Sequence, residues 1–221
     1  MRWRMRHHWV LKSLGITAFM WVFFALYFHL LRHPRLAVLV MPLTALDRAL
    51  PFQPAAFAAY ASLWVYVGFP VGLMLSLREM LRYGAWMGSL CGVGLLCFYF
   101  VPTAVPPFDL TGVDLGHSGM ALLQGVDAAG NACPSLHVAF AVFTALWFAR
   151  LLRQMNAAHF VRVLNWLWCL GILYSTVAIR QHVALDVLAG AALGAAVAAA
   201  HLRWLKRCRP ALSAGEVRGV G

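Results

Sequence analysis

Charged side chains are scarce in this sequence, and their scarcity excludes a soluble globular domain. Only 11% of the residues are Asp, Glu, Lys or Arg, whereas soluble domains carry roughly 25%. Cysteines are also few, five in the whole chain, and their scattered positions exclude a disulfide framework. Hydrophobic residues instead make up 62% of the chain. This composition indicates an integral membrane protein.

Long apolar runs fill most of the chain. A transmembrane helix needs about 20 mainly apolar residues. We expect such helices near residues 10–31, 56–77, 84–105, 134–153, 160–179 and 184–205. No internal repeat or low-complexity linker divides the chain. The predicted fold is therefore all-α: a polytopic membrane protein in which residues 1–221 form one integral membrane domain, a six-transmembrane-helix bundle.

Basic residues greatly outnumber acidic ones, giving a net charge of +11, and their positions predict the orientation of the bundle. If the N-terminus is cytoplasmic, all Lys and Arg residues lie on the cytoplasmic side except Arg32, Arg35, Arg48 and Arg180. This asymmetry is the positive-inside bias of membrane proteins. We predict cytoplasmic N- and C-termini, contact with anionic membrane lipids and no nucleic-acid partner. The alanine and arginine content favours a bacterial inner membrane, which would make the outer loops periplasmic.

One polar stretch, Cys133-Pro134-Ser135-Leu136-His137, precedes the fourth predicted span and has the features of a helix start. Proline is favoured at the first helical position, where its missing N–H costs nothing, and we place Pro134 there. The first backbone amides of a helix have no intrahelical acceptor, and the helix dipole favours an anion beside them. The amides of Ser135 and Leu136 are therefore candidate phosphate ligands, with His137 next to them.

A second polar stretch, around His182, precedes the sixth predicted span on the same side of the membrane. His182 and Asp186 are four residues apart, so on a helix they share one face and the carboxylate can accept a hydrogen bond from the imidazole. An oriented neutral imidazole is a nucleophile or a base, whereas a second, protonated histidine such as His137 can protonate a leaving oxygen. Together with Arg180, these residues predict phosphoryl transfer without a metal or another cofactor.

These stretches resemble the second and third signature motifs of the type-2 phosphatidic acid phosphatase superfamily. Pro134-Ser135-Leu136-His137 matches the family's Pro-Ser-x-His block. Ser175-Thr176, followed by five residues, His182, three residues and Asp186, matches the third block, with Thr176 where the phosphatases usually have arginine. With Leu136 in place of glycine, and Arg180-Gln181 before the histidine, the chain is more similar to the inositol-phosphorylceramide-synthase-like branch.

The resemblance implies a role for each of these residues. His182 would be the nucleophile, Asp186 its orienting partner and His137 the general acid, while Ser135 and Arg180 would bind phosphate. The family's first motif, a lysine and then Arg-Pro, has no counterpart, because residues 98–108 include no cation.

Three further residues are candidates for a supporting role. Arg48 could replace a cation of the missing motif, although we favour an interfacial anchor. Ser175 and Thr176 could support the site or hydrogen-bond back to their own helix. The loop 106–133 contains Asp109, Asp114, His117 and Asp127. Because their spacing is irregular, we favour a solvated loop that caps the active site, and we consider a metal site the less favoured alternative.

The predicted function is hydrolysis of a lipid phosphate, a phospholipid or a polyprenyl phosphate, at the outer leaflet through a phosphohistidine. One alternative is a phosphotransferase that moves a phosphoryl headgroup to an acceptor alcohol. The other is a non-catalytic scaffold or a transporter, and the absence of inverted repeats disfavours transport.

In the last span, Gly190 and Gly194 form a face of small residues that predicts close packing against the fourth span, with a homodimer contact as the alternative.

Overall fold

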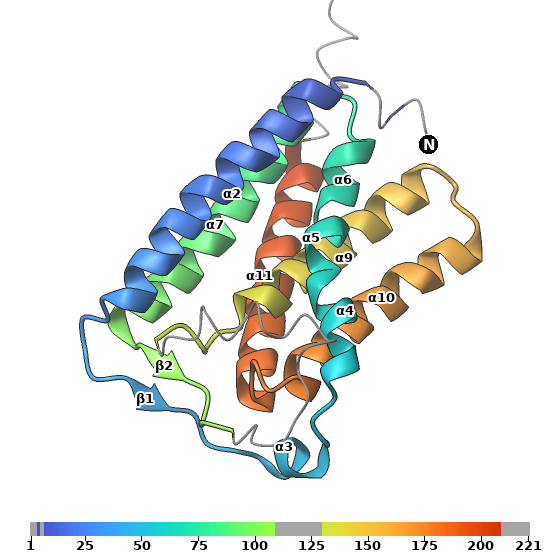
Figure 1. Ribbon diagram of the computed structural model, residues 1–221. Helices are drawn as coiled ribbons and strands as arrows, with labels where there is room; N and C mark the ends of the chain where they lie inside the picture. Colours follow the sequence, from blue (N-terminus) through green and yellow to red (C-terminus); the bar gives the residue numbers. More distant parts are fainter. Residues whose placement is uncertain (1–3, 5–6, 109–129, 209–221) are drawn as a thin grey trace, which may run out of the picture.

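The computed structural model describes residues 4, 7–108 and 130–208, and it is a helical bundle with one very small sheet (Figure 1). Within this part of the chain, six helical segments are long and apolar enough to cross a membrane. They are α2 (Trp9–Arg32), the broken segment Pro54–Leu73, α7 (Leu77–Phe100), α9 (Leu136–Gln154), α10 (His159–Ala178) and α11 (Ala184–Cys208). The expected fold, a mainly helical multi-pass membrane protein, is thereby confirmed.

The second and third spans differ from the predicted ones. Segment Pro54–Leu73 consists of four short pieces, η1 (Pro54–Ala56), α4 (Phe57–Ala61), α5 (Leu63–Tyr66) and α6 (Gly68–Leu73). Helix α7 begins at Leu77 instead of residue 84 and ends at Phe100 instead of residue 105. Its end follows from Pro102, since the residue before a proline is disfavoured in a helix. Its early start places three charged residues, Arg78, Glu79 and Arg82, on the helix.

The segment between the first two spans contains a short strand and a short helix. Strand β1 (Leu39–Val40) pairs in parallel with β2 (Thr103–Ala104), which follows α7. The short helix α3 (Ala45–Ala49) then begins at a capping box formed by Thr44 and Asp47. This connection therefore crosses the end of the bundle where α9 and α11 begin (Figure 1).

Helix α9 is the centre of the bundle. In an 18-residue stretch of α9, 78% of the residues are buried, against 33% or less in a stretch of the same length in each of the other five spans. Helix α11 packs closely along it, because Gly190 and Gly194 face the backbone carbonyls of Ser135 and Ala139. The predicted packing of the small-residue face against the fourth span is confirmed, and it joins the two helices whose starts carry the histidines.

Enlarging Gly190 is expected to separate these two helices. In Gly190→Ala the new methyl group would overlap the Ser135 carbonyl oxygen, so we expect a loss of about 1–3 kcal/mol in the free energy of unfolding. Denaturant titration in mixed micelles measures this loss. Gly171→Ala in α10 is the matched control, since its methyl group meets open space and alanine is the better helix former. Equal stability of the two variants would contradict the close packing.

Candidate active site

Helix α9 begins at Leu136, two residues after the predicted start at Pro134. Ser135 is the N-cap, and its hydroxyl accepts a hydrogen bond from the Val138 amide at 3.3 Å. The amide of Ser135 donates to the Asp186 carbonyl at 3.1 Å. Ser135 is therefore fully buried in the joint between α9 and α11, and the leading amides of the helix belong to Leu136 and His137.

The side chain of Leu136 fills a space that another helix leaves open. A Cβ atom on Gly94 of α7 would overlap the Leu136 side chain. The glycine of the family motif is thus absent at position 136, and a glycine on the facing helix makes room for the larger residue. Leu136 also lines the cavity described below.

His137 is held on one edge by the backbone of α4. Its Nε2 atom lies 3.0 Å from the Tyr60 carbonyl oxygen, and since a carbonyl only accepts, Nε2 carries a proton. The imidazole stacks on the Tyr60 ring with 3.9 Å between centroids and 6° between planes. The other ring nitrogen, Nδ1, is therefore the atom that can exchange a proton with a substrate.

His182 lies in the turn between α10 and α11, two residues before α11 begins. Its amide and that of Gln181 both donate to the Thr176 carbonyl. The His182 Nδ1 atom is 3.5 Å from Asp186 Oδ2, a contact longer than a good hydrogen bond. Catalytic hydrogen bonds are often this long in a substrate-free site. The expected pairing is present as a close contact, formed by a turn leading into the helix instead of by one helical face.

Asp186 is completely buried and connects three parts of the site. Its Oδ2 atom accepts the Val183 amide at 3.1 Å, which caps the start of α11. Its Oδ1 atom has no hydrogen-bond partner among the described residues. The carboxylate therefore lies where it can orient the His182 imidazole through its Nδ1 atom.

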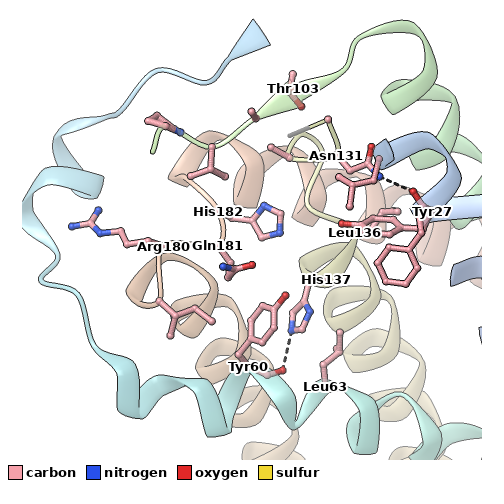
Figure 2. A pocket seen from close by; sticks show the side chains of 18 of the residues that line it. Tyr27, Tyr60, Leu63, Thr103, Asn131, Leu136, His137, Arg180, Gln181 and His182 are labelled. Carbon is pink, nitrogen blue, oxygen red and sulfur yellow. Dashed lines mark hydrogen bonds between the residues drawn. The ribbon is translucent and has the colours of Figure 1, made fainter. Parts of the chain in front are cut away.

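Both histidines line one cavity of about 660 Å³ (Figure 2). Figure 2 shows the two rings with the side chain of Gln181 next to them. These three residues form one polar part of the cavity wall, and Thr103, Asn131 and Arg180 are further polar residues of the lining. The rest is mainly apolar and is lined from α2, α5 and α9 by Phe23, Phe24, Phe28, Leu63, Trp64 and Phe140. The cavity therefore places a polar head site beside an aromatic chamber within the bundle.

Arg180 contributes to the cavity wall, but its guanidinium is engaged elsewhere. It donates to the carbonyls of Asp47 at 2.5 Å and Leu50 at 2.7 Å, and it lies over the Phe108 ring at 4.9 Å. Figure 2 shows the side chain extending away from His137 and His182. The backbone at Arg180 is left-handed, with φ 59°, a costly conformation for this residue. In this structure Arg180 thus binds α3, and its predicted phosphate contact stays a prediction.

Asp47 holds the start of α11 from outside that helix. Its Oδ1 atom accepts the Ala184 amide at 2.8 Å across 137 residues of sequence, and its Oδ2 atom accepts from the Thr44 amide and hydroxyl. Burial alone would raise the pKa of the Asp47 carboxyl. The hydrogen bonds from Thr44 and Ala184, with the positive charge of Arg180, outweigh burial and lower that pKa. Asp47 and Arg180 together fasten α3 to the turn that carries His182.

Removing the charge of Asp47 is expected to loosen this turn. We expect Asp47→Asn to lower the free energy of unfolding by about 1–3 kcal/mol, as a buried donor loses its charged acceptor. Arg48→Gln, at the exposed neighbouring position, should change it by less than about 0.5 kcal/mol. The folded-state pKa of Asp47 is lowered. The difference in free energy of unfolding between the wild type and Asp47→Asn therefore has its maximum value above about pH 4 and decreases as the pH falls through that lowered pKa. A difference that grows with acidification would contradict the assignment.

The three residues predicted as support do not line the cavity. The Ser175 hydroxyl donates to Ile172 and the Thr176 hydroxyl to Leu173, each at 2.7 Å. Both therefore bond back to α10, the structural alternative left open above. Arg48 is exposed on α3. Asp109, Asp114, His117 and Asp127 lie outside the described residues.

Several residues of the site were missed at the level of sequence. Tyr60 and Asp47 belong to no motif, and their roles follow from long-range contacts. Gln181 appeared only in the resemblance, with no role assigned to it. Asp47 gave one local signal, the capping pattern Thr44-x-x-Asp47.

Burial raises the pKa of the Cys133 thiol to about 11, helped by the charge of Asp186, so this cysteine stays protonated at neutral pH. Among the described residues, no group of three or more His, Cys, Asp or Glu side chains could hold a metal ion.

Comparison with known families agrees with this geometry. Residues 102–210 match the PAP2 superfamily, a stretch that includes β2, α9, α10, α11 and both histidines. A search of the curated proteins found no match. The match supports the superfamily and gives no information on a branch within it. Through residues 102–210, this multi-pass membrane protein belongs to the PAP2 superfamily, whose members are typically metal-independent phosphatases.

Proposed function

We propose that the protein hydrolyses a lipid phosphate through a phosphohistidine on His182. The observation that carries this proposal is the cavity shared by His137 and His182. The two histidines come from separate helix starts, and one lies next to a buried carboxylate while the other lies against a carbonyl. Such a difference in environment suits one histidine to nucleophilic attack and the other to proton transfer.

The first step would transfer the phosphoryl group to the protein. Because Nδ1 of His182 faces Asp186, its Nε2 atom is the nucleophile, and it attacks phosphorus while the ester oxygen leaves. His137, protonated at both nitrogens, donates its Nδ1 proton to that oxygen and keeps its Nε2 hydrogen bond to Tyr60. The imidazolium formed on His182 is stabilised by Asp186. In the second step water attacks the phosphohistidine, loses a proton to His137 and releases phosphate.

The phosphate would be bound mainly by uncharged donors. The amides of Leu136 and His137 lead α9, where the helix dipole favours an anion. Gln181 lines the same end of the cavity and can donate through its side-chain amide. Arg180 would join them only after releasing the carbonyls of Asp47 and Leu50. Backbone amides at a helix start therefore replace much of what the missing lysine and arginine of the first motif supply elsewhere.

The shape of the cavity supports a lipid as the substrate. The aromatic residues from α2 and α5 line the same cavity as the two histidines, and burying a hydrocarbon chain against them stabilises binding by about 0.8 kcal/mol per CH₂ group. A phospholipid or polyprenyl phosphate could place its headgroup on the histidines and its chain between α2 and α5. With the predicted orientation of the bundle, the site would face the outer leaflet and the periplasm.

Mass spectrometry of a lipid extract incubated with the purified protein tests the proposal. We expect one class of lipid phosphate to decrease, its dephosphorylated product to increase and free phosphate to appear in equal amount. If the headgroup instead moves to another lipid without phosphate release, the protein is a phosphotransferase, as its resemblance to the inositol-phosphorylceramide-synthase-like branch would favour. Unchanged lipids would count against both activities and support a non-catalytic role.

A further inference from the structure

A second cavity, of about 180 Å³, lies at the opposite end of the bundle from the two histidines. It is formed by the first turns of α7 and the last turns of α9 and α11. On α9, His137 lines the first cavity and Trp147 and Arg150 line the second, so at roughly 1.5 Å per residue about 15–20 Å of helix separates these residues. The positive-inside bias predicts that this end is cytoplasmic.

The lining of this second cavity is strongly basic. Arg78 and Arg82 of α7 and Arg150 of α9 all contribute to it, against a single carboxylate, Glu79. Arginine keeps its charge in proteins, so the three guanidinium groups and the one carboxylate leave the lining with a net positive charge, which favours a further anion among them. Guanidinium groups are also the side chains best suited to binding phosphate oxygens.

Aromatic rings hold two of these arginines in place. The guanidinium carbon of Arg150 lies 4.6 Å from the Trp147 ring centre, and that of Arg82 lies 5.2 Å from the Trp204 ring centre. Cation–π contacts of this kind restrict the side chains before any ligand arrives. Less conformational entropy is then lost on binding.

A buried histidine supplies an independent observation. His201 of α11 is fully buried and lines this cavity. Its Nδ1 atom accepts a hydrogen bond from the Trp147 indole at 2.9 Å, so in the neutral ring the proton is on Nε2. Among the described residues this Nε2 atom has no hydrogen-bond partner. A buried donor without an acceptor is costly. Because the Nε2 atom has less than 1 Å² of accessible surface, an oxyanion in the cavity would satisfy it after a small movement of the side chains around it.

We propose that this second cavity is an anion site that binds a phosphate group through Arg78, Arg82, Arg150 and the Nε2 proton of His201. The start of α7 adds unpaired backbone amides on the same side. A single water occupies roughly 30 Å³ in the liquid, so the cavity has room for a phosphate group but not for acyl chains. The ligand is therefore the headgroup phosphate of an anionic phospholipid whose chains stay in the membrane, or free phosphate.

Two binding measurements on the full-length protein distinguish these sources. The first is the thermal shift caused by inorganic phosphate in detergent, at constant ionic strength with chloride as reference. The second is native mass spectrometry of phospholipids retained from nanodiscs of phosphatidylcholine with and without phosphatidylglycerol. A rise in melting temperature with phosphate but not with chloride identifies free phosphate as a ligand. Selective retention of phosphatidylglycerol identifies the phosphate of a lipid headgroup as the ligand.

Variants show whether the binding belongs to this cavity. We expect Arg82→Gln and Arg150→Gln each to weaken binding about tenfold or more, as a charge-assisted contact is lost. Arg153→Gln is the matched control, an exposed arginine one turn further along α9 and outside the cavity lining. Arg78→Gln changes an exposed arginine of the lining. This variant replaces the other two in the binding measurements if they do not fold.

The outcomes are separate from those of the catalytic proposal, because neither measurement uses turnover. Binding of phosphate or of phosphatidylglycerol that the cavity variants weaken and Arg153→Gln does not would support the second site. If neither ligand binds, or if the cavity variants bind as the wild type does, the proposal is wrong. The proposed phosphatase activity would stand unchanged in that case.

Discussion

Replacing His182 by alanine is expected to lower the rate of phosphate release by about 10⁴-fold or more, the effect seen when a covalent nucleophile is removed. Without the imidazole no phosphohistidine can form, and water alone would have to attack the ester. The folded structure should survive, because His182 lies in a turn and is 12% exposed at the cavity. The measurement is free phosphate released from the lipid identified by mass spectrometry.

His33→Ala is the matched control for this variant. His33 is an exposed histidine at the end of α2, outside the lining of the catalytic cavity, and its replacement should leave the rate within about twofold. Both proteins are compared at equal amounts after confirming similar melting temperatures. Residual activity of His182→Ala within tenfold of the wild type would remove His182 from the role of nucleophile.

Replacing His137 by glutamine is expected to slow the reaction by about 10²–10⁴-fold, the usual contribution of general acid–base catalysis. Glutamine can still donate a hydrogen bond toward the Tyr60 carbonyl, so the contact that orients the side chain can be kept. What is lost is the proton for the leaving oxygen. The effect should therefore depend on the leaving group.

Comparison of two substrates isolates that proton transfer. An alkyl phosphate releases a strongly basic oxygen and needs the proton, whereas p-nitrophenyl phosphate releases a stable anion and does not. We expect His137→Gln to be strongly impaired with the alkyl phosphate and only mildly impaired with p-nitrophenyl phosphate, relative to the wild type on each. An equal loss on both substrates would indicate that His137 positions the phosphate instead of protonating the leaving group.

The parts of the fold that follow from local sequence were the ones predicted well. Apolar runs and prolines define the spans, and the spacing of Gly190 and Gly194 was enough to predict their packing on α9. The start of α7 was misplaced because Arg78, Glu79 and Arg82 were assigned to a loop. Charged residues are tolerated in the first turns of a membrane helix, where long side chains can reach the interface.

The residues of the site were predictable only as far as motifs extend. Both histidines and Asp186 come together as expected, because each lies next to the start of a helix. The contacts of a long side chain depend on residues that are distant in sequence. The hydrogen bonds from Arg180 to the carbonyls of Asp47 and Leu50 therefore could not be predicted from the position of Arg180 in the sequence. The same holds for Asp47, whose partner Ala184 is 137 residues away.

The central claim is a covalent bond between phosphorus and His182, and rapid acid-free quenching of the protein with a ³²P-labelled lipid phosphate tests it most directly. We predict a label that is stable in alkali, lost in acid and located on the peptide containing His182. The label should be absent from His182→Ala and from wild type quenched before substrate is added. Full turnover without any labelled protein, or a label on another residue, would contradict the account.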